Sequence, residues 1–273
     1  MTINKKYIEL QRILKEMGEV IVAFSGGVDS AFLLKVSIDV LGDKAHGVLA
    51  VSPTYPSREY EKAISLARSI GAQLEIINTH ETENEDFLKN PLNRCYFCKS
   101  ELFDRILEIA ESRKYKNLAD GSNMDDLHDH RPGREALKER GVRSPLQEAG
   151  LYKEDIRQLS RQLGLSVWNK ESLACLSSRF PYGERIDLHK LRMVDSMENF
   201  LQDLGFRNIR ARHHNNTLKI EVSSSDIGYF LSEDLRKKVI GQAKKLGYRY
   251  VTLDLEGYRQ GSLNAVIHQP VHQ

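Results

Sequence analysis

The chain has 273 residues, which is enough for one large domain or two modest ones. Its 40 Lys and Arg residues nearly balance its 38 Asp and Glu residues, so no strong net field would attract nucleic acid or an anionic membrane. Hydrophobic residues make up 40% and charged residues 29%, a composition that excludes extensive disorder. No apolar run approaches the roughly 20 residues that span a bilayer, and the amino terminus lacks a secretory signal. We therefore expect a cytoplasmic protein that does not enter a membrane.

The first half of the chain alternates short apolar runs with amphipathic stretches. We predict strands at 20–24, 46–51, 73–77 and 117–119. Helices are expected from about residue 30, through 63–70 and, after the Cys95 region, through 102–109. Repeated β-α-β units of this kind are typical of an α/β fold with a doubly wound, Rossmann-like parallel sheet, whose ligands bind at the carboxyl ends of the strands.

The pattern changes after about residue 185. We predict a helix at 188–204, strands at 209–213 and 218–222, a helix at 234–246 and a strand at 250–253. These elements indicate a smaller α+β domain. We place the domains at residues 1–180 and 181–273, with a further helix at 152–163 in the first.

The segment Ser-Gly-Gly-Val-Asp-Ser, residues 25–30, lies between the first predicted strand and the first predicted helix. Glycines let backbone amides approach a phosphate closely, and the amino terminus of a helix favours an anion. The segment lacks the Gly-Lys-Ser/Thr ending of a Walker loop, and its simplest alternative is a tight turn with a serine cap. We predict that it binds phosphate groups through Ser25, Gly26, Gly27, Asp29 and Ser30.

Two further polar segments follow predicted strands. The turn 120–126 contains Gly121 and Asn123, and a glycine turn with acids and amides suits a ribose, an adenine or a metal. Ser52 follows the second strand and is expected at the same site. The alternative for the turn is an Asx-rich turn without a ligand.

The three cysteines, Cys95, Cys98 and Cys175, are too few and of odd number for a disulfide framework. Cys175 lies among serines and close to Arg179, and a nearby arginine favours the thiolate, which is the nucleophilic form of a cysteine. A cysteine in apolar surroundings is more often inert. Cys95 and Cys98 form a Cys-x-x-Cys pair, which by itself fits half of a zinc site completed by a histidine, a redox pair or two incidental thiols.

Residues 25–30 resemble the SGGxDS loop of the PP-loop ATP pyrophosphatases. This resemblance implies that ATP is the ligand of the loop and of Ser52, Gly121 and Asn123. Over nearly its whole length the chain is similar to the LarE family of ATP-dependent sulfur transferases, through SGGVDS, DGSNMDD, CLSSRFPYGE, RARHH and TLDLEGYRQGSLN. The resemblance implies that a substrate carboxylate attacks the α-phosphorus of ATP and that pyrophosphate leaves, with Mg²⁺ bound and Asp29 orienting the metal or the pyrophosphate. It also implies a pyridinium dicarboxylate mononucleotide as substrate, a thiocarboxylate as product, and a role in making the nickel-pincer nucleotide cofactor of lactate racemase.

The resemblance leaves two sources for the sulfur. In the sacrificial mechanism, Cys175 attacks the acyl-adenylate, AMP leaves, and elimination breaks the cysteine Cβ–S bond, leaving dehydroalanine on a protein that turns over once. In the other mechanism, Cys95, Cys98 and Cys175 hold a [4Fe-4S] cluster whose fourth iron carries an external sulfide. All three cysteines fall in segments expected near the ATP site, which favours the cluster.

Several side chains are expected to contact the substrate. Arg210 and Arg212 are two residues apart on a predicted strand, so they share a face of the sheet, and guanidinium groups bind phosphate bidentately. Ordinary solvated charge is the alternative. Glu221, on the next strand, would pair with an arginine or bind a divalent cation. The remaining candidates are Tyr96, which would stack on the pyridinium ring or pack in the core, and Arg131, Arg179 and Arg259.

By resemblance, the loop around Arg259 lies near the active site of a neighbouring subunit, which implies a homo-oligomer. Two other functions compete with the sulfur transferase. A tRNA thiolation enzyme would use the same loop and a three-cysteine cluster, but the near-neutral charge and the lack of a dedicated RNA-binding motif argue against tRNA. A non-catalytic nucleotide or metal sensor would bind ATP without releasing pyrophosphate.

Overall fold

The structure is a computed structural model, which describes residues 1–128, 132–171, 174–259 and 262–263. The chain forms two compact units. The first comprises Met1–Phe87 and Leu92–Leu173, and the second comprises Leu88–Pro91 and the chain from Ala174 onward. Each unit has a β-sheet of its own.

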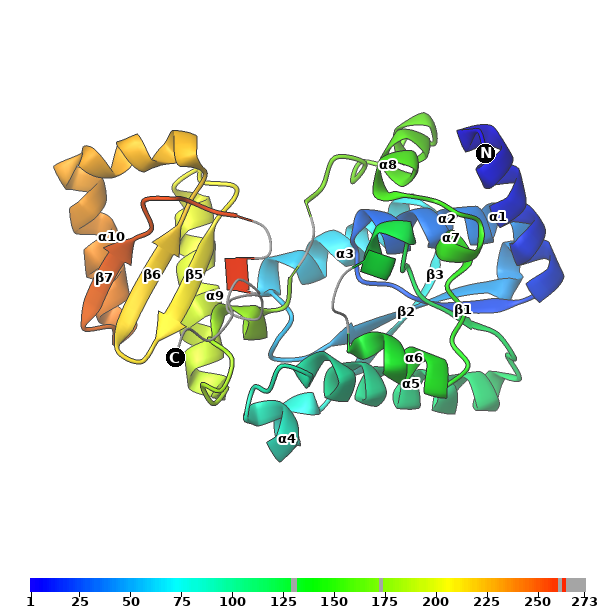
Figure 1. Cartoon of the computed structure of the whole chain (residues 1–273), viewed down its shortest axis with the longest axis horizontal. Coiled ribbons are helices and arrows are strands. Elements are labelled where there is room, and N and C mark those ends of the chain that lie inside the picture. The colour runs from blue at the N-terminus through cyan, green and yellow to red at the C-terminus, as the bar shows by residue number, and fades with distance from the viewer. Residues whose placement is uncertain (129–131, 172–173, 260–261, 264–273) are drawn as a thin grey trace, which may run out of the picture. The chain divides into compact units, whose positions relative to one another are not determined.

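The first unit is built on a parallel sheet with the strand order β3-β2-β1-β4 (Figure 1). The strands are β1 (Val20–Ala23), β2 (Ala45–Val51), β3 (Gln73–Asn78) and β4 (Leu118–Ala119). Because β2 and β4 lie on opposite sides of β1, the strand order reverses at β1. Ligands of open α/β sheets bind at the carboxyl end of such a reversal. The predicted α/β fold with a parallel sheet is confirmed.

Helices cover both faces of this sheet. The helices in this part of the chain are α1 (Ile3–Met17), α2 (Val28–Leu41), α3 (Ser57–Ser69), α4 (Glu85–Leu88), α5 (Arg94–Arg113), α6 (Gly133–Glu139), α7 (Pro145–Glu148) and α8 (Lys153–Gln162). The 3-10 segments are η1 (Gly42–Lys44), η2 (Glu81–Glu83) and η3 (Met124–His128). Val20 and Val22 of β1 belong to a core that includes residues of α1, α2 and α3. Ile21, which points to the other face, belongs to a second core with residues of α5 and α6.

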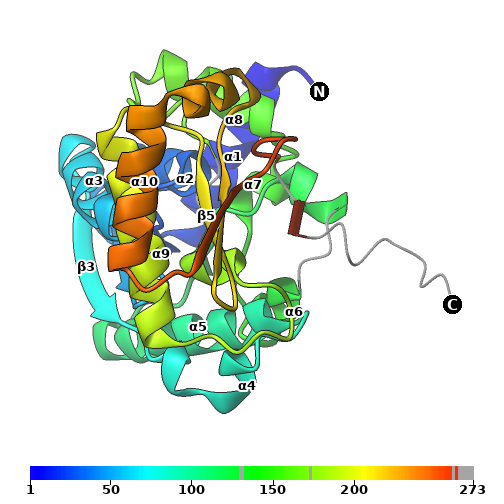
Figure 2. The ribbon, with the colours of Figure 1, turned by 90° about the vertical axis from the view of Figure 1, so that its left-hand side faces the viewer.

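The second unit has a sheet of three strands, β5 (Arg210–His214), β6 (Thr217–Glu221) and β7 (Tyr250–Leu253). β5 and β6 form an antiparallel hairpin, and β7 pairs with β6 in parallel. α9 (Leu188–Asp203) contacts β5, and α10 (Glu233–Lys245) contacts α9 (Figure 2). The 3-10 segments η4 (Leu176–Arg179) and η5 (Ser224–Leu231) complete the described elements. This is the smaller α+β arrangement that the sequence predicts.

The structure differs from the prediction at the start of α5. The sequence predicts a helix that follows the Cys95 region, whereas α5 begins at Arg94 and includes both Cys95 and Cys98. The first apolar residue that α5 buries is Phe103, so hydrophobic periodicity does not mark the beginning of the helix.

Candidate active site

The predicted phosphate loop connects β1 to α2 at the reversal of the sheet. Gly26 has a φ of +68°, and a Cβ atom there would lie 2.8 Å from the Cβ of Ala63, so only glycine fits. Gly27 is the N-cap of α2 and has no side chain to cap the first turn, which leaves the amides of that turn to an anion. A Cβ atom on Gly121, in the turn after β4, would lie 2.9 Å from the backbone nitrogen of Ser30. The turns after β1 and β4 therefore meet closely.

Hydrogen bonds within the first unit set the shape of the loop. The Ser30 hydroxyl accepts a hydrogen bond from the backbone N–H of Ser25 at 3.1 Å and donates to the Gly27 carbonyl at 3.2 Å. The hydroxyls of Ser25 and Ser30 lie 3.2 Å apart. Tyr55 donates its hydroxyl to the Ser25 carbonyl at 3.0 Å, and burial raises the pKa of Tyr55, so this donor keeps its proton. The loop is thus preorganised, as an electrostatic binding site requires.

Asp29, the second residue of α2, is held by two side chains. Its Oδ1 accepts a hydrogen bond from the amide of Asn123 at 3.3 Å, and its Oδ2 forms an ion pair with Lys153. The carboxylate therefore lies at the point where the turns after β1 and β4 meet. A carboxylate in this place suits the predicted role of orienting Mg²⁺ or pyrophosphate.

Ser52, directly after β2, belongs to a hydrogen-bonded group with Thr54 and Glu81. The hydroxyls of Ser52 and Thr54 lie 2.9 Å apart, and both donate to Oε1 of Glu81. Glu81 is 2% exposed, and its Oε2 has no hydrogen-bond partner among the described residues. Ser52 therefore helps to hold a buried carboxylate, and its contact with ATP stays a prediction.

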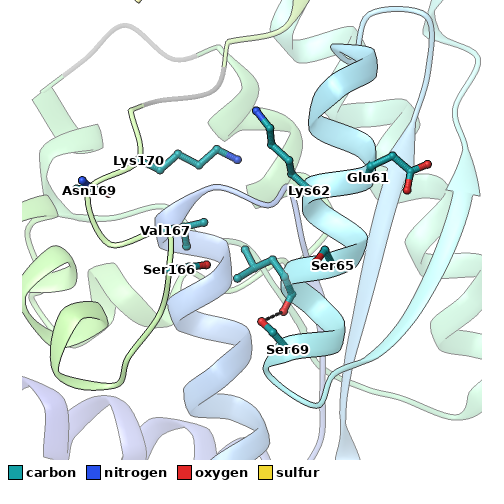
Figure 3. A pocket seen from close by; sticks show the side chains of 9 residues that line it. Glu61, Lys62, Ser65, Ser69, Ser166, Val167, Asn169 and Lys170 are labelled. Atoms are coloured by element: carbon teal, nitrogen blue, oxygen red, sulfur yellow. Dashed lines mark hydrogen bonds between the residues drawn. The ribbon is translucent and has the colours of Figure 1, made fainter. Parts of the chain in front are cut away.

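A surface groove lies between α3 and the segment 166–170 (Figure 3). Its lining residues are Glu61, Lys62, Ser65, Leu66, Ser69, Ser166, Val167, Asn169 and Lys170. Lys170 donates to the Gly26 carbonyl at 2.9 Å and pairs with Glu59 at 2.6 Å. Burial raises the pKa of Glu59, but hydrogen bonds from Lys170 and Lys62 outweigh burial and lower it below its ordinary value. Lys170 thus joins the phosphate loop to the end of the groove.

Cys95 and Cys98 lie three residues apart in the first turns of α5 and therefore on the same side of the helix. Cys95 is exposed and Cys98 is half-buried. Tyr96 donates its hydroxyl to Glu139 of α6 at 2.8 Å, and this hydrogen bond raises the pKa of Tyr96. In the part of the chain that the structure describes, no three His, Cys, Asp or Glu side chains form a group that could hold a metal ion.

Cys175 belongs to the second unit, where it is the N-cap residue of η4. The guanidinium of Arg179 donates to the carbonyls of Ala174 and Cys175, each at 3.1 Å. It also forms two hydrogen bonds of 2.8 Å with the carboxylate of Glu198 on α9, and Arg179 is only 3% exposed. These contacts make Arg179 a positioning residue for the peptide of Cys175, while its predicted contact with substrate stays a prediction.

Arg212 and Glu221 form a second buried pair, between β5 and β6. The Nη2 of Arg212 lies 2.8 Å from Oε2 of Glu221, and Glu221 is 1% exposed. Arg212 also donates to the Ser178 carbonyl at 3.0 Å and to the Ser262 hydroxyl at 2.8 Å. Of the two roles expected for Glu221, pairing with an arginine is present in the structure; binding of a divalent cation stays a prediction.

Arg210 differs from Arg179 and Arg212 because no carboxylate pairs with it among the described residues. Its guanidinium lies 4.6 Å from the ring centroid of Tyr258 and donates to the Tyr258 hydroxyl at 3.1 Å. Burial and the positive charge of Arg179 lower the pKa of Arg210. A bound anion would stabilise the charged guanidinium and so raise this pKa again. Arg210 is therefore suited to bind a phosphate.

Two other arginines, Arg259 and Arg131, are predicted from the sequence to contact the substrate. Arg259 is exposed and pairs with Glu256, three residues before it. Arg131 lies outside the described residues.

Sequence reasoning missed four side chains that hold the candidate residues: Lys153, Lys170, Glu198 and Tyr258. Each acts through a partner far away in the sequence. Lys153, Lys170 and Glu198 lie in none of the quoted motifs, and Tyr258 lies in TLDLEGYRQGSLN, which does not reveal its partner. Only Lys153 carries a signal of its own. It is the first residue of α8, where a positive charge opposes the helix dipole and is unusual without a partner.

Comparison with known proteins identifies the family. The NAD synthase family model matches residues 3–92, which include β1, the phosphate loop and α2. The chain is 39% identical to pyridinium-3,5-bisthiocarboxylic acid mononucleotide synthase of Lactiplantibacillus plantarum, a LarE protein, over 96% of this chain and 95% of that protein. The chain belongs to the LarE family. An uncharacterised protein of Synechocystis sp. is 43% identical to this LarE-family chain, over 97% of the chain and 99% of that protein. An uncharacterised protein of Methanocaldococcus jannaschii is 29% identical, over 95% of the chain and 99% of that protein.

Membership of the LarE family defines the class of chemistry. The protein is an ATP-dependent, adenylating sulfur transferase that uses ATP with Mg²⁺. Asp29 is a residue of the phosphate loop, and its carboxylate suits the binding of this ion. None of the described helices combines the length and the apolar character that a bilayer-spanning segment needs.

Proposed function

We propose that this LarE-family enzyme adenylates a ring carboxylate of a pyridinium dicarboxylate mononucleotide and converts it to a thiocarboxylate. The product would serve the synthesis of the nickel-pincer nucleotide cofactor of lactate racemase. The observation that carries the proposal is the 39% identity, along 96% of the chain, to a synthase whose name specifies a pyridinium bisthiocarboxylic acid mononucleotide.

In the first step, a carboxylate oxygen of the substrate attacks the α-phosphorus of ATP, and the bond to pyrophosphate breaks. We assign the phosphates to Ser25, Gly26, Gly27 and Ser30, the Mg²⁺ to Asp29, and the nucleoside of ATP to Ser52, Gly121 and Asn123. Negative charge builds on the leaving pyrophosphate, so donors fixed at the loop stabilise the transition state. The preorganised hydrogen bonds of the loop support this assignment.

Arg210 is proposed to bind the phosphate of the substrate, with Arg212 as its neighbour on β5. The lack of a carboxylate partner for Arg210 among the described residues supports this role, because its charge remains to be neutralised. Further contacts are assigned to Tyr96, Arg131, Arg179 and Arg259. The proposal gives ATP chemistry to residues 1–180, which also supply Tyr96, Arg131 and Arg179 to the substrate. It gives the remaining substrate contacts and the homo-oligomer contacts to residues 181–273, in a protein of the cytoplasm.

For the sulfur, we favour a [4Fe-4S] cluster held by Cys95, Cys98 and Cys175. The position of Cys95 and Cys98 on one side of α5 supports this, since two thiolates so placed suit neighbouring irons. When bound, the cluster would supply an external sulfide and allow repeated turnover. The chain's own contribution is to hold the three thiolates.

The sacrificial route is the second candidate, and the firm hold of Arg179 on the peptide of Cys175 favours it. Here the Cys175 thiolate would displace AMP from the acyl-adenylate to form a thioester. Loss of the Cα proton would then break the Cβ–S bond. The thiocarboxylate would leave with the sulfur, and dehydroalanine would remain at position 175.

Two measurements test these proposals. Pyrophosphate release that requires the pyridinium dicarboxylate mononucleotide supports the function, whereas release with tRNA instead, or no release, contradicts it. For the sulfur, protein purified without oxygen should contain about four irons with acid-labile sulfide, and Cys95→Ala should lose them. A metal-free protein whose intact mass shows dehydroalanine after the reaction would overturn the cluster and support the sacrificial route.

A further inference from the structure

Backbone contacts fix Lys153 beside the turn that follows β4. Its own N–H donates to the Asp125 carboxylate at 2.7 Å. Two residues earlier, the carbonyl of Leu151 accepts a hydrogen bond from the N–H of Met124 at 2.9 Å. The first residue of α8 is therefore tied to the same turn that supplies Asn123.

The Lys153 side chain extends from α8 to the phosphate loop. Its ammonium pairs with Oδ2 of Asp29, and among the described residues it makes no other hydrogen bond. An ammonium has three N–H donors, so this contact leaves donors for a ligand. The side chains of Lys153 and Asp29 are 25% and 22% exposed, so solvent and ligands have access to the pair.

The charge of Asp29 gives this pair a consequence for ATP. A carboxylate at the second residue of α2 would repel a triphosphate bound at the amino terminus of that helix, where the loop amides attract it. Lys153 shares the neutralisation of Asp29 with the Mg²⁺ assigned to that carboxylate, and it adds donors at the same place. Asp29 in turn orients the ammonium.

We propose that Lys153 is a phosphate-binding residue of this enzyme. Its ammonium, held by Asp29, donates to the phosphates that leave as pyrophosphate and neutralises the charge that builds on them. The inference rests on the proposed assignment of residues 25–30 to the phosphates of ATP.

The test compares the wild-type protein with Lys153→Met, Lys153→Arg and the control Lys6→Met. Lys6 pairs with Asp155 of the same helix, α8, at 2.6 Å, and its side chain is 13% exposed. The control therefore removes a similar ion pair that does not involve the loop. Calorimetry measures the Kd of a non-hydrolysable ATP analogue with Mg²⁺ and the Kd of AMP, and thermal unfolding verifies the fold of each variant.

We expect Lys153→Met to weaken binding of the ATP analogue about tenfold or more, to leave AMP binding unchanged, and to be partly rescued in Lys153→Arg. Lys6→Met should leave both affinities unchanged. Equal loss of ATP and AMP affinity, or no loss of either, would overturn the inference. A wild-type protein that fails to bind the ATP analogue would instead contradict the proposed function.

Discussion

Arg179, Arg210 and Arg212 are three arginines of one unit with different surroundings. Arg179 and Arg212 each face a buried carboxylate, whereas Arg210 faces a tyrosine. Desolvation of two buried charges is offset only while the pair is intact, so removal of one partner is costly. The stability of the unit should therefore depend on the paired arginines, and ligand binding on the unpaired one.

Replacing Glu198 with Gln should lower the free energy of unfolding by about 3 kcal/mol or more, because the buried Arg179 would lose its countercharge. Urea unfolding followed by circular dichroism measures the change. Glu9→Gln is the control, since Glu9 pairs with Arg12 on the surface of α1 and should matter little. A Glu198→Gln protein as stable as this control would contradict the role given to the buried pair.

Replacing Arg210 with Met should weaken binding of the mononucleotide substrate about tenfold or more, since one charge-assisted hydrogen bond to phosphate is lost. The melting temperature should change little, because no carboxylate is left unpaired. Titration of the substrate measures its Kd. The control Arg207→Met changes an exposed arginine three residues earlier and should bind substrate like the wild-type protein. Equal substrate affinities in the two variants would show that Arg210 does not bind the substrate.

At the scale of elements, the loop between β1 and α2 depends on one glycine. In Gly26→Ala the new Cβ would lie 2.8 Å from the Cβ of Ala63, so the loop must shift and ATP binding should be lost. Gly18, after α1, has a similar φ of +75°, but an added Cβ there meets nothing within 4 Å. Gly18→Ala should lower stability by about 1 kcal/mol and keep ATP affinity. Titration of both variants with ATP measures the two affinities. Unchanged ATP binding in Gly26→Ala would contradict the need for glycine at this position.

β5 should make stability sensitive to acid. Burial lowers the pKa of both His213 and His214, so the unfolded chain binds protons more readily than the folded chain. The contribution of these two histidines to stability is therefore fully present above the ordinary histidine pKa of about 6.5. This contribution is lost as the pH falls below that value. The positive charge of Lys190 acts on His213 in the same direction as burial, and Glu184 opposes it.

His213→Gln should make the fall of melting temperature between about pH 7 and pH 5 less steep, since one of the groups that take up protons on unfolding is removed. Melting curves across this range measure the slope. Parallel slopes for the variant and the wild-type protein would show that His213 does not contribute.

The sequence predicts those elements whose signal is local. The strands agree with the structure within about one residue at each end because apolar runs lie between polar turns, as at β1 and β7. The start of α5 is missed because its first turns bury little that is apolar, and the short helices α6 and α7 are not predicted. Lys153 and Glu198 escape sequence reasoning because their partners, Asp29 and Arg179, are brought to them only by the tertiary fold.

At the scale of the whole molecule, the second unit is built from two separate segments of the chain, Leu88–Pro91 and the residues from Ala174 onward. Asn90, in the segment Leu88–Pro91, donates its amide to the carbonyls of Phe180 at 3.3 Å and Pro181 at 2.6 Å, and its own carbonyl accepts from the N–H of Gly183 at 2.9 Å. These bonds join segments about ninety residues apart, which no linear pattern reveals. The phosphate loop with Cys95 and Cys98 belongs to one unit, and Cys175 with the buried arginines to the other.

The chemistry proposed for the whole molecule converts one carboxylate into a thiocarboxylate at the expense of ATP. Mass spectrometry of the nucleotide formed from pure protein, ATP, Mg²⁺, a sulfide source and pyridinium dicarboxylate mononucleotide tests it. We predict a product in which sulfur replaces a carboxylate oxygen, with AMP and pyrophosphate formed in equal amounts. A nucleotide recovered unchanged, from a protein that still binds ATP, would contradict the proposal.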